Sequence, residues 1–457
     1  MRHAAAIPLL LTALACNLGQ GIGGNLEPTV LAAMVPTASP VVSGPPTPAY
    51  IPVECAGVPL ATLAPERRPT PEPEVNPPLN LPAQLEVLRG LENAVRDLYL
   101  YPDFGGLDWP TAAAETRTRI EAGMDTQVFY EALGELVLRL GDEHSYFQTP
   151  AEIAAEQATI EGQFDFVGIG VLVQPRIGKG LGTILAVLPG SPAERSGLRP
   201  HDNILAIDGV QSAEGGIPQQ QLLRGPACSQ VVLTVRTPGG PERQVGLVRS
   251  AVSGALPINA SLLPTADGSR IGYLFFPTFL DQSLPDRVEQ ALPDLGPLHG
   301  LILDDRVNGG GLGSVAEAML GFFTSGMVGS FVDRSGQTPL TIVANPVHDS
   351  QSVPLVVLIG ADTVSYGEIF AGVLQDMGRA QLVGQATLGN VERLSQVDLA
   401  DGSRLWLAVE RFQPLNSDAD WEQQGILPDI AVPGDWEDFT PEDDPALAVA
   451  LQLLGYP

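Results

Sequence analysis

The chain has 457 residues, and its 53 Asp and Glu against 24 Lys and Arg give a formal net charge of −29. This charge argues against nucleic-acid binding, because no basic stripe is present to neutralise phosphates. The length allows two or three domains with substantial cores, and the acidic balance is compatible with a soluble, extracytoplasmic protein.

The first 16 residues have the pattern of an export signal. Arg2 and His3 precede an apolar run over 4–14, which is too short to span a bilayer, and the segment ends in Ala15-Cys16. It resembles a bacterial lipoprotein signal in which Cys16 is acylated, although Ala13 stands where leucine is preferred. The alternative is an ordinary cleaved signal with an incidental cysteine. We expect export and lipid anchoring at the outer face of the cell membrane or in the cell envelope.

Residues 17–81 are rich in Pro, Thr, Ala and Gly, which predicts a disordered tether. Only two further cysteines follow Cys16, Cys55 in this tether and Cys228 in an expected turn, so a disulfide framework is not indicated. A single bridge between these two remains open.

A helical N-terminal domain is predicted over 82–160. Apolar residues recur there at steps of three and four, which places them on single helix faces. In two runs, these are Leu85, Leu88, Leu91, Val95 and Leu98, then Tyr130, Leu133, Leu136, Val137 and Leu140.

The region 353–390 carries the most chemical information. An apolar run over 354–359 predicts a buried strand, a polar turn over 360–364 follows, and 366–377 has helical spacing. Ser365 therefore lies at a helix N-terminus, where backbone N–H groups and the helix dipole favour developing negative charge. By itself such a serine is more often only a helix cap.

Sequence blocks in this region and upstream of it resemble, in their order, those of the C-terminal processing, or tail-specific, serine peptidases. The blocks are the strand and Ser365 turn, LQDMGRA, VGQATLG, LILDDRVNGGGLG and the upstream motif GDEHS. Within this resemblance, 251–457 is an α/β catalytic domain of the crotonase-like ββα-spiral type. Its strands and helices alternate, as in an α/β fold, and 444–455 is a closing helix.

A PDZ domain is predicted over 161–250. FVGIGVLV, VLPGSPAERSGLRPHDNILAIDGV and RGPACSQVVLTVRTPGG follow in the order typical of protease PDZ domains. In such a domain a peptide adds to a sheet edge, and the N–H groups around Val167, Gly168, Ile169 and Gly170 would bind its terminal carboxylate.

The resemblance implies that Ser365 is the nucleophile, but the lysine that usually deprotonates it is replaced by Asn390. The one lysine of the chain, Lys179, is in the predicted PDZ domain. The tricorn-type branch uses a histidine at the motif matching GDEHS, which implies His144 as base, and a carboxylate matching Glu422 in WEQQGILPDI to orient it. The alternative is that His144 has only a structural role and that Glu422 faces solvent.

The oxyanion donors expected for acyl transfer are the backbone N–H groups of Tyr366 and Gly310, with Gly311 as second choice. We expect no cofactor, and no His, Cys, Asp or Glu cluster with zinc-ligand spacing is evident. These features predict a serine endopeptidase acting on protein or peptide substrates with free C-termini. The alternative, favoured by Asn390, is a catalytically degenerate peptide-binding or scaffold protein.

Overall fold

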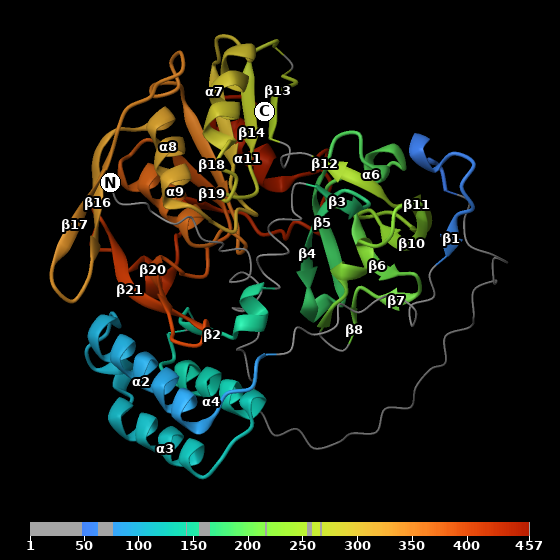
Figure 1. Cartoon of the computed structure of the whole chain (residues 1–457). Coiled ribbons are helices and arrows are strands. Elements are labelled where there is room, and N and C mark those ends of the chain that lie inside the picture. The colour runs from blue at the N-terminus through green and yellow to red at the C-terminus, as the bar shows by residue number, and fades with distance from the viewer. Residues whose placement is uncertain are drawn as a thin grey trace, which may run out of the picture.

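The computed structural model describes residues 48–62, 76–142, 144–154, 165–214, 217–253, 258–265 and 267–456. The predicted signal, with Cys16, lies outside these residues. Figure 1 shows three bodies: a bundle of helices, a large α/β part beside it, and a separate, mostly β part. Among the described helices, none is both long and apolar enough to cross a membrane.

The predicted N-terminal helices are α2 (Leu81–Leu98), α3 (Trp109–Glu121) and α4 (Thr126–Leu138). Each begins where an Asn or Asp side chain accepts a hydrogen bond from a backbone N–H of the first turn, which satisfies a donor that has no partner within the helix. Nearly all of the predicted apolar positions face the core, but Leu98 is exposed at the end of α2.

The sequence suggested a helical domain of its own over 82–160. In the structure, these helices share their core with the α/β part. This core includes Leu405 and Leu407 of strand β21 (Arg404–Pro414), and β2 (Tyr146–Gln148) pairs with β21. The helices therefore rest directly on a sheet of the α/β part. The short helix η4 (Phe104–Gly106) links α2 to α3.

The PDZ-like part has strands β4 (Val171–Arg176), β5 (Leu181–Val187), β6 (Asn203–Ile207) and β10 (Ser229–Arg236) in the sheet order β10-β6-β5-β4. β11 pairs with β10, and β3 pairs with β12 in a separate two-stranded ladder. The remaining elements are β3 (Asp165–Gly168), η5 (Ile177–Lys179), α6 (Pro192–Arg195), β7 (Val210–Gln211), β8 (Ala213–Glu214), β9 (Ile217–Pro218), η6 (Gln220–Leu223), β11 (Glu242–Val248) and β12 (Ser250–Ser253).

Part of the expected tether is structured. Within 48–62, η2 (Val53–Cys55) is followed by β1 (Ala61–Thr62), which pairs in parallel with β10. Cys55 and Cys228 form a disulfide, with their Cα atoms 5.3 Å apart. The prediction of a disordered tether is therefore wrong for this stretch, because a covalent bond and sheet pairing hold a sequence that could not bury enough apolar surface alone.

The α/β part contains a sheet of order β13-β14-β15-β18-β19-β22, parallel except for β13. A second sheet has the order β17-β16-β21-β2, with β20 also on β21. The strands are β13 (Asn259–Leu263), β14 (Ile271–Phe275), β15 (Gly300–Asp304), β16 (Gly326–Val332), β17 (Gln337–Ile342), β18 (Leu355–Ile359), β19 (Gln381–Gly384), β20 (Glu392–Asp398) and β22 (Ile430–Ala431).

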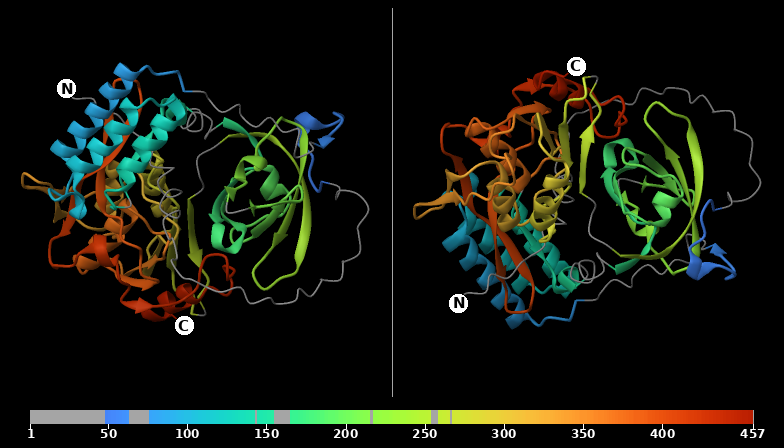
Figure 2. Two further views of the ribbon diagram at one scale, coloured as in Figure 1. Left: turned by 90° about the horizontal axis from the view of Figure 1, so that it is seen from below. Right: turned by 90° about the horizontal axis from the view of Figure 1, so that it is seen from above.

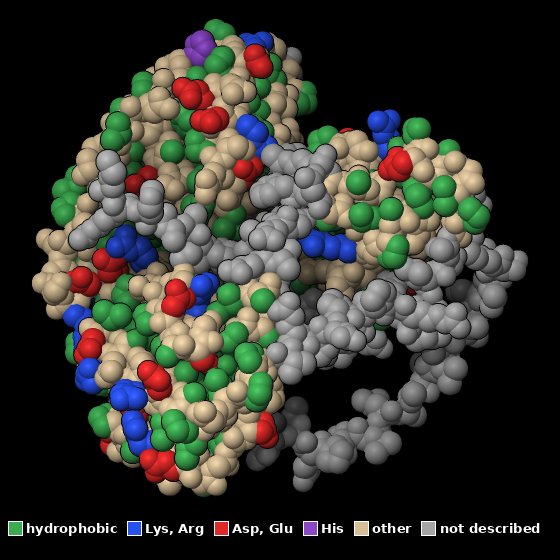
Figure 3. All heavy atoms as spheres, in the orientation of Figure 1, with side chains coloured by type: hydrophobic (Ala, Val, Ile, Leu, Met, Phe, Trp, Pro, Cys, Tyr) green, Lys and Arg blue, Asp and Glu red, His purple; other side chains and the backbone are tan. Residues whose placement is uncertain are grey.

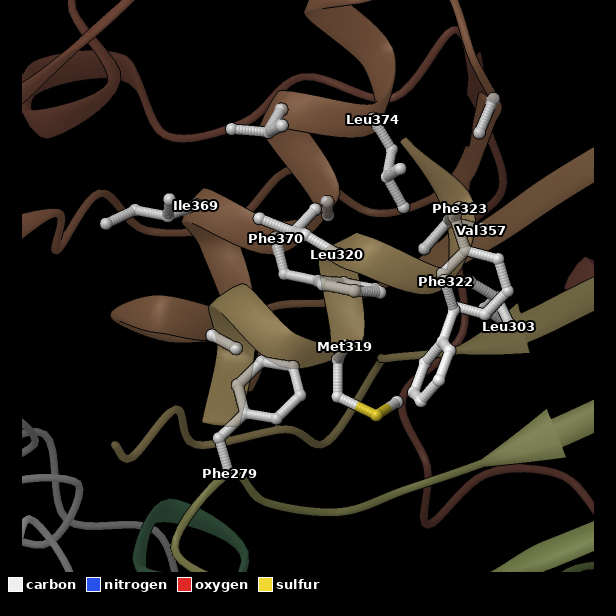
Figure 4. Packing of buried hydrophobic residues seen from close by; sticks show 14 of the residues in the cluster. Phe279, Leu303, Met319, Leu320, Phe322, Phe323, Val357, Ile369, Phe370 and Leu374 are labelled. Carbon is white, nitrogen blue, oxygen red and sulfur yellow. The ribbon is translucent and has the colours of Figure 1, made fainter. Parts of the chain in front are cut away.

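Helices cover both faces of the parallel sheet, as its continuous apolar strands require. α11 (Pro445–Leu453), the predicted closing helix, lies on one face. α7 (Leu284–Asp294), α8 (Gly313–Phe323) and α9 (Tyr366–Asp376) contribute to the core on the other. Figure 4 shows Phe370 of α9 beside Phe279 and Met319, with the two phenyl ring centroids 5.4 Å apart. This packing fixes α9, and with it the turn that carries Ser365.

The PDZ-like part lies beside the α/β part in both views of Figure 2. Lys179 forms ion pairs with Asp435 and Glu437, and the Arg176 guanidinium pairs with Asp362, 2.6 Å away, and with Glu437. Lys179, the one lysine of the chain, thus forms part of the contact between the two parts. On the face drawn in Figure 3, acidic and basic side chains are intermixed over the helices rather than gathered by sign.

Candidate active site

Ser365 lies where the sequence predicted, in the turn between the buried strand β18 and helix α9. Its backbone has φ 58° and ψ −124°, a region that non-glycine residues rarely occupy. The turn is held by the loop after β15, since Thr363 Oγ1 donates to the Asp305 carbonyl at 2.7 Å and Val364 N–H to the Asn308 carbonyl at 2.9 Å. A strained serine at a helix N-terminus, fixed from both sides, is the geometry expected of an activated hydroxyl.

The glycine run approaches Ser365 closely. Gly310 has φ 78°, and a Cβ built there would lie 2.8 Å from Ser365 Cβ and 2.7 Å from the Val364 carbonyl oxygen. Only glycine fits at this position. The Gly310 N–H, however, donates to Asn308 Oδ1 at 3.0 Å, whereas the N–H groups of Gly311 and Tyr366 find no acceptor among the described residues. This favours the second-choice glycine over the first as an oxyanion donor.

His144 is held by its own motif between α4 and β2. Asp142 accepts hydrogen bonds from the backbone N–H groups of His144 and Ser145, at 3.0 and 2.8 Å, and from Ser145 Oγ. Ser145 Oγ in turn accepts from the Ala408 N–H on β21. The hydrogen bonds of Asp142 and Ser145 thus anchor His144 to the α/β sheet.

The structure brings His144 and Glu422 together although they are 278 residues apart in sequence. His144 Nε2 lies 2.5 Å from Glu422 Oε1. Glu422 is in the first turn of α10 (Trp421–Gln424), and its Oε2 accepts from the Val391 N–H at 2.8 Å. His144 is buried and the Glu422 side chain is only 15% exposed, so the prediction of a His–Glu pair matches the geometry.

One loop joins this pair to Ser365. Glu368 Oε2 accepts from the Ser365 N–H at 3.0 Å, and Oε1 accepts from Thr387 Oγ1 and the Gly389 N–H at 2.6 and 2.9 Å. Two residues later Val391 binds Glu422. Asn390 is thus located between the two anchoring points, in the segment where the family lysine would be.

Two buried carboxyl groups near the site have altered acidity. Burial raises the pKa of Glu368 to about 7, although its three donors favour the ionised form. Burial and the charge of Glu422 raise the pKa of Glu392 to about 8. Glu392 begins β20, accepts a hydrogen bond from the Tyr101 hydroxyl, and was not identified from the sequence. No local motif marks it, because its neighbours come from distant segments.

The predicted peptide-binding loop joins β3 to β4. Val167 and Gly168 pair with β12, and the side chain of Ile169 is buried in the PDZ core. Gly170 has φ 81°, and a Cβ there would clash with Ser191. The N–H groups of Ile169 and Gly170 have no acceptor among the described residues. This arrangement can bind an anion through backbone donors.

The fold and this site define a PDZ-containing α/β serine peptidase. The chain matches Peptidase family S41 over residues 270–432 and a PDZ domain over residues 183–237. It is 32% identical over 339 residues to a carboxyl-terminal-processing protease of Picosynechococcus sp., covering 71% of this chain and 78% of the relative. It therefore belongs to the C-terminal processing serine peptidases of family S41.

Other relatives agree. A chloroplastic C-terminal processing peptidase of Tetradesmus obliquus is 31% identical, over 77% of this chain and 78% of that protein. A solved photosystem II D1 C-terminal processing protease has a TM-score of 0.56 at 28% identity and covers 77% of this chain and 93% of its own. The family and the α/β multidomain fold with a PDZ domain, both predicted from sequence, are confirmed.

The acidity of Glu368 predicts a pH-dependent stability. Its folded pKa of about 7 lies above the ordinary value of 4.5, so the folded state binds this proton more tightly than the unfolded state. Its contribution to the free energy of unfolding should therefore fall as pH rises from 4.5 to 7, by on the order of 3 kcal/mol. In Glu368→Gln this component should be absent, so the variant should gain stability relative to wild type across that window.

Urea unfolding at a series of pH values measures this difference. A constant offset is expected in addition, because an amide cannot accept all three hydrogen bonds. Parallel stability curves for the two proteins would show that Glu368 ionises normally.

Proposed function

We propose that the protein is an exported serine endopeptidase that cleaves proteins or peptides through an acyl-enzyme, with Ser365 as nucleophile and His144 as base. The observation that carries the proposal is the 2.5 Å contact between His144 Nε2 and Glu422 Oε1. A buried imidazole paired with a carboxylate is the arrangement that holds a histidine tautomer and stabilises imidazolium.

In the proposed reaction, Nε2–H donates to the Glu422 carboxylate, so the basic nitrogen is Nδ1. Nδ1 takes the proton of Ser365 Oγ as the oxygen attacks the scissile carbonyl, and then gives it to the leaving amine. Water, deprotonated by the same nitrogen, hydrolyses the ester. The N–H groups of Tyr366 and of Gly311 or Gly310 would stabilise the oxyanion.

Lys179 does not qualify as the base. Its ammonium group is bound at the contact between the PDZ and α/β parts, by Asp435 and Glu437. Burial lowers the pKa of Lys179, but the hydrogen bonds to Glu437 and Asp435 outweigh this and raise it above the ordinary value. It therefore stays protonated at neutral pH, which supports a histidine mechanism.

The second candidate function is a degenerate family member that binds peptides or serves as a scaffold. Asn390 favours it, because an amide cannot accept the serine proton as the family lysine does. Reaction with a fluorophosphonate distinguishes the two, since it requires an activated serine but no knowledge of the natural substrate.

Wild type should be labelled by a fluorophosphonate, and Ser365→Ala should not. His144→Ala should slow labelling by roughly 10²–10⁴, the usual contribution of a general base. Glu422→Gln should cost less, because its role is orientation. Matched controls are Ser352→Ala and His299→Ala, which change exposed residues and should label like wild type.

Asn390→Lys tests the alternative directly. In an active histidine enzyme it should give no gain in labelling. An inert wild type that becomes labelled once Asn390→Lys is introduced would identify a silenced lysine-type protease and exclude the histidine mechanism.

We further propose that the PDZ domain selects substrates by their free C-terminus. The support is the loop 167–170, in which the successive N–H groups of Ile169 and of the positive-φ Gly170 have no acceptor within the described part of the chain. A carboxylate accepts charge-assisted hydrogen bonds from such donors, whereas a carboxamide carries no charge.

Peptides with an apolar last residue should therefore bind Ser365→Ala protein more weakly once their C-terminus is amidated. The expected loss is about tenfold, equivalent to roughly 1.4 kcal/mol. Fluorescence anisotropy with matched acid and amide peptides measures it, and equal affinities would rule out carboxylate recognition.

For location, we propose anchoring at the outer face of a bacterial membrane or in the cell envelope through acylated Cys16. The Cys55–Cys228 disulfide supports export, because disulfides persist in oxidising compartments. Metabolic labelling with a palmitate analogue in a bacterial host should mark wild type but not Cys16→Ser. Equal absence of label in both would leave an ordinary signal peptide as the explanation.

A further inference from the structure

The His144–Glu422 pair is part of a larger buried cluster that includes Glu392. A ring nitrogen of His144 and one carboxylate oxygen from each glutamate all lie within 4.8 Å of one another. His144 and Glu392 are 8% and 6% exposed. The three side chains come from the turn after α4, the start of β20 and the first turn of α10.

Two carboxyl groups this close and this buried can both be ionised only when a positive charge compensates them. Among the described residues, neither Glu392 nor Glu422 forms an ion pair with a lysine or an arginine. Glu392 also has a second, independent feature: its Oε2 is buried and has no hydrogen-bond partner among the residues that the structure describes. An unsatisfied carboxylate oxygen in such a cluster points to a ligand that the chain does not itself provide.

Hydrogen bonds from neighbouring residues orient the two carboxylates, as the outer hydrogen-bond partners of metal ligands do. The Tyr101 hydroxyl donates to Glu392 Oε1, and the Val391 N–H donates to Glu422 Oε2. One oxygen of each carboxylate is thus held by a donor outside the cluster. The other oxygens face the cluster: Glu422 Oε1 contacts His144 Nε2, and Glu392 Oε2 has no partner among the described residues. One imidazole and two carboxylates form a three-ligand zinc set with a fourth position for water, whereas Mg²⁺ and Ca²⁺ prefer oxygen ligands alone.

We propose that His144, Glu392 and Glu422 form a regulatory binding site for a divalent transition cation of the Zn²⁺ type. The cation inserts between His144 Nε2 and Glu422 Oε1 and takes Glu392 Oε2 as its third ligand. A metal bound at Nε2 occupies the lone pair of this nitrogen. The one proton of the neutral ring, which Nε2 carries in the absence of metal, must then be on Nδ1. An imidazole protonated at Nδ1 cannot accept the serine proton, so the bound metal switches the protease off. This consequence rests on the proposed function, whereas the binding itself does not.

Binding is tested first, on full-length Ser365→Ala protein, so that no activity is needed. Calorimetry with Zn²⁺ should show one site, and Co²⁺ should give the intense visible d–d bands of a tetrahedral centre. Glu392→Gln should weaken Zn²⁺ at least tenfold, and His144→Ala should weaken it further. The matched control is Asp398→Asn, an exposed carboxylate at the other end of β20, which should bind like the parent.

Failure to bind Zn²⁺, or equal affinity of the parent and the Glu392→Gln variant when both are folded by circular dichroism, would overturn the proposal. The inhibitory consequence is tested with the fluorophosphonate: Zn²⁺ should slow labelling of wild type and slow labelling of Glu392→Gln at least tenfold less. Equal sensitivity of these two proteins would refute the switch. A wild type that binds zinc but is never labelled would contradict the proposed protease and leave the metal site established.

Discussion

The hydrogen bond between His144 and Glu422 unites segments from opposite ends of the folded chain, and much of the architecture serves to hold it. His144 is positioned because β2 pairs with β21 and because Ser145 binds the same strand. The helices α2, α3 and α4 share a core with β21, so they hold this strand, and the turn of His144 bound to it, in place. Glu422 is positioned by α10, whose Trp421 is buried against Phe412. A short bond between two buried groups survives only when both sides are held this firmly.

Acidic groups dominate the interior of the site. Glu368 binds the Ser365 turn and the loop 387–389, while Glu392 and Glu422 lie on the far side of that loop. Each is removed from water, and Glu422 contributes to the raised pKa of the other two. Glu368 and Glu392 therefore keep their protons to higher pH than solvent-exposed carboxyl groups do.

The contact between the PDZ and α/β parts combines ion pairs with a buried apolar cluster, in which Leu185 of β5 packs with Phe275 and Trp436. Arg176 and Lys179, at the β4–β5 connection, meet acidic residues of the segment after β22, and Arg176 also holds Asp362 in the turn that leads to Ser365. His201 adds a stacking contact with Trp436, with ring centroids 4.0 Å apart. Ion pairs at such a boundary contribute geometric specificity more than net stability, because desolvation offsets much of their attraction. The PDZ part is thereby held in place relative to the turn that carries Ser365.

The sequence by itself determined the features that depend on neighbours along the chain. The strand over 354–359, the serine turn, helix α9 and the glycines of the PDZ loop follow from local periodicity and backbone freedom. His144 and Glu422 were found only through resemblance, since no spacing relates them. The tertiary structure alone decided the rest: the helical segment shares its core with β21, Cys55 meets Cys228, the Gly310 N–H is occupied by Asn308, and Glu392 completes the buried cluster. These are contacts between residues far apart in sequence. Sheet pairing and burial determine them, and local sequence patterns carry no signal for them.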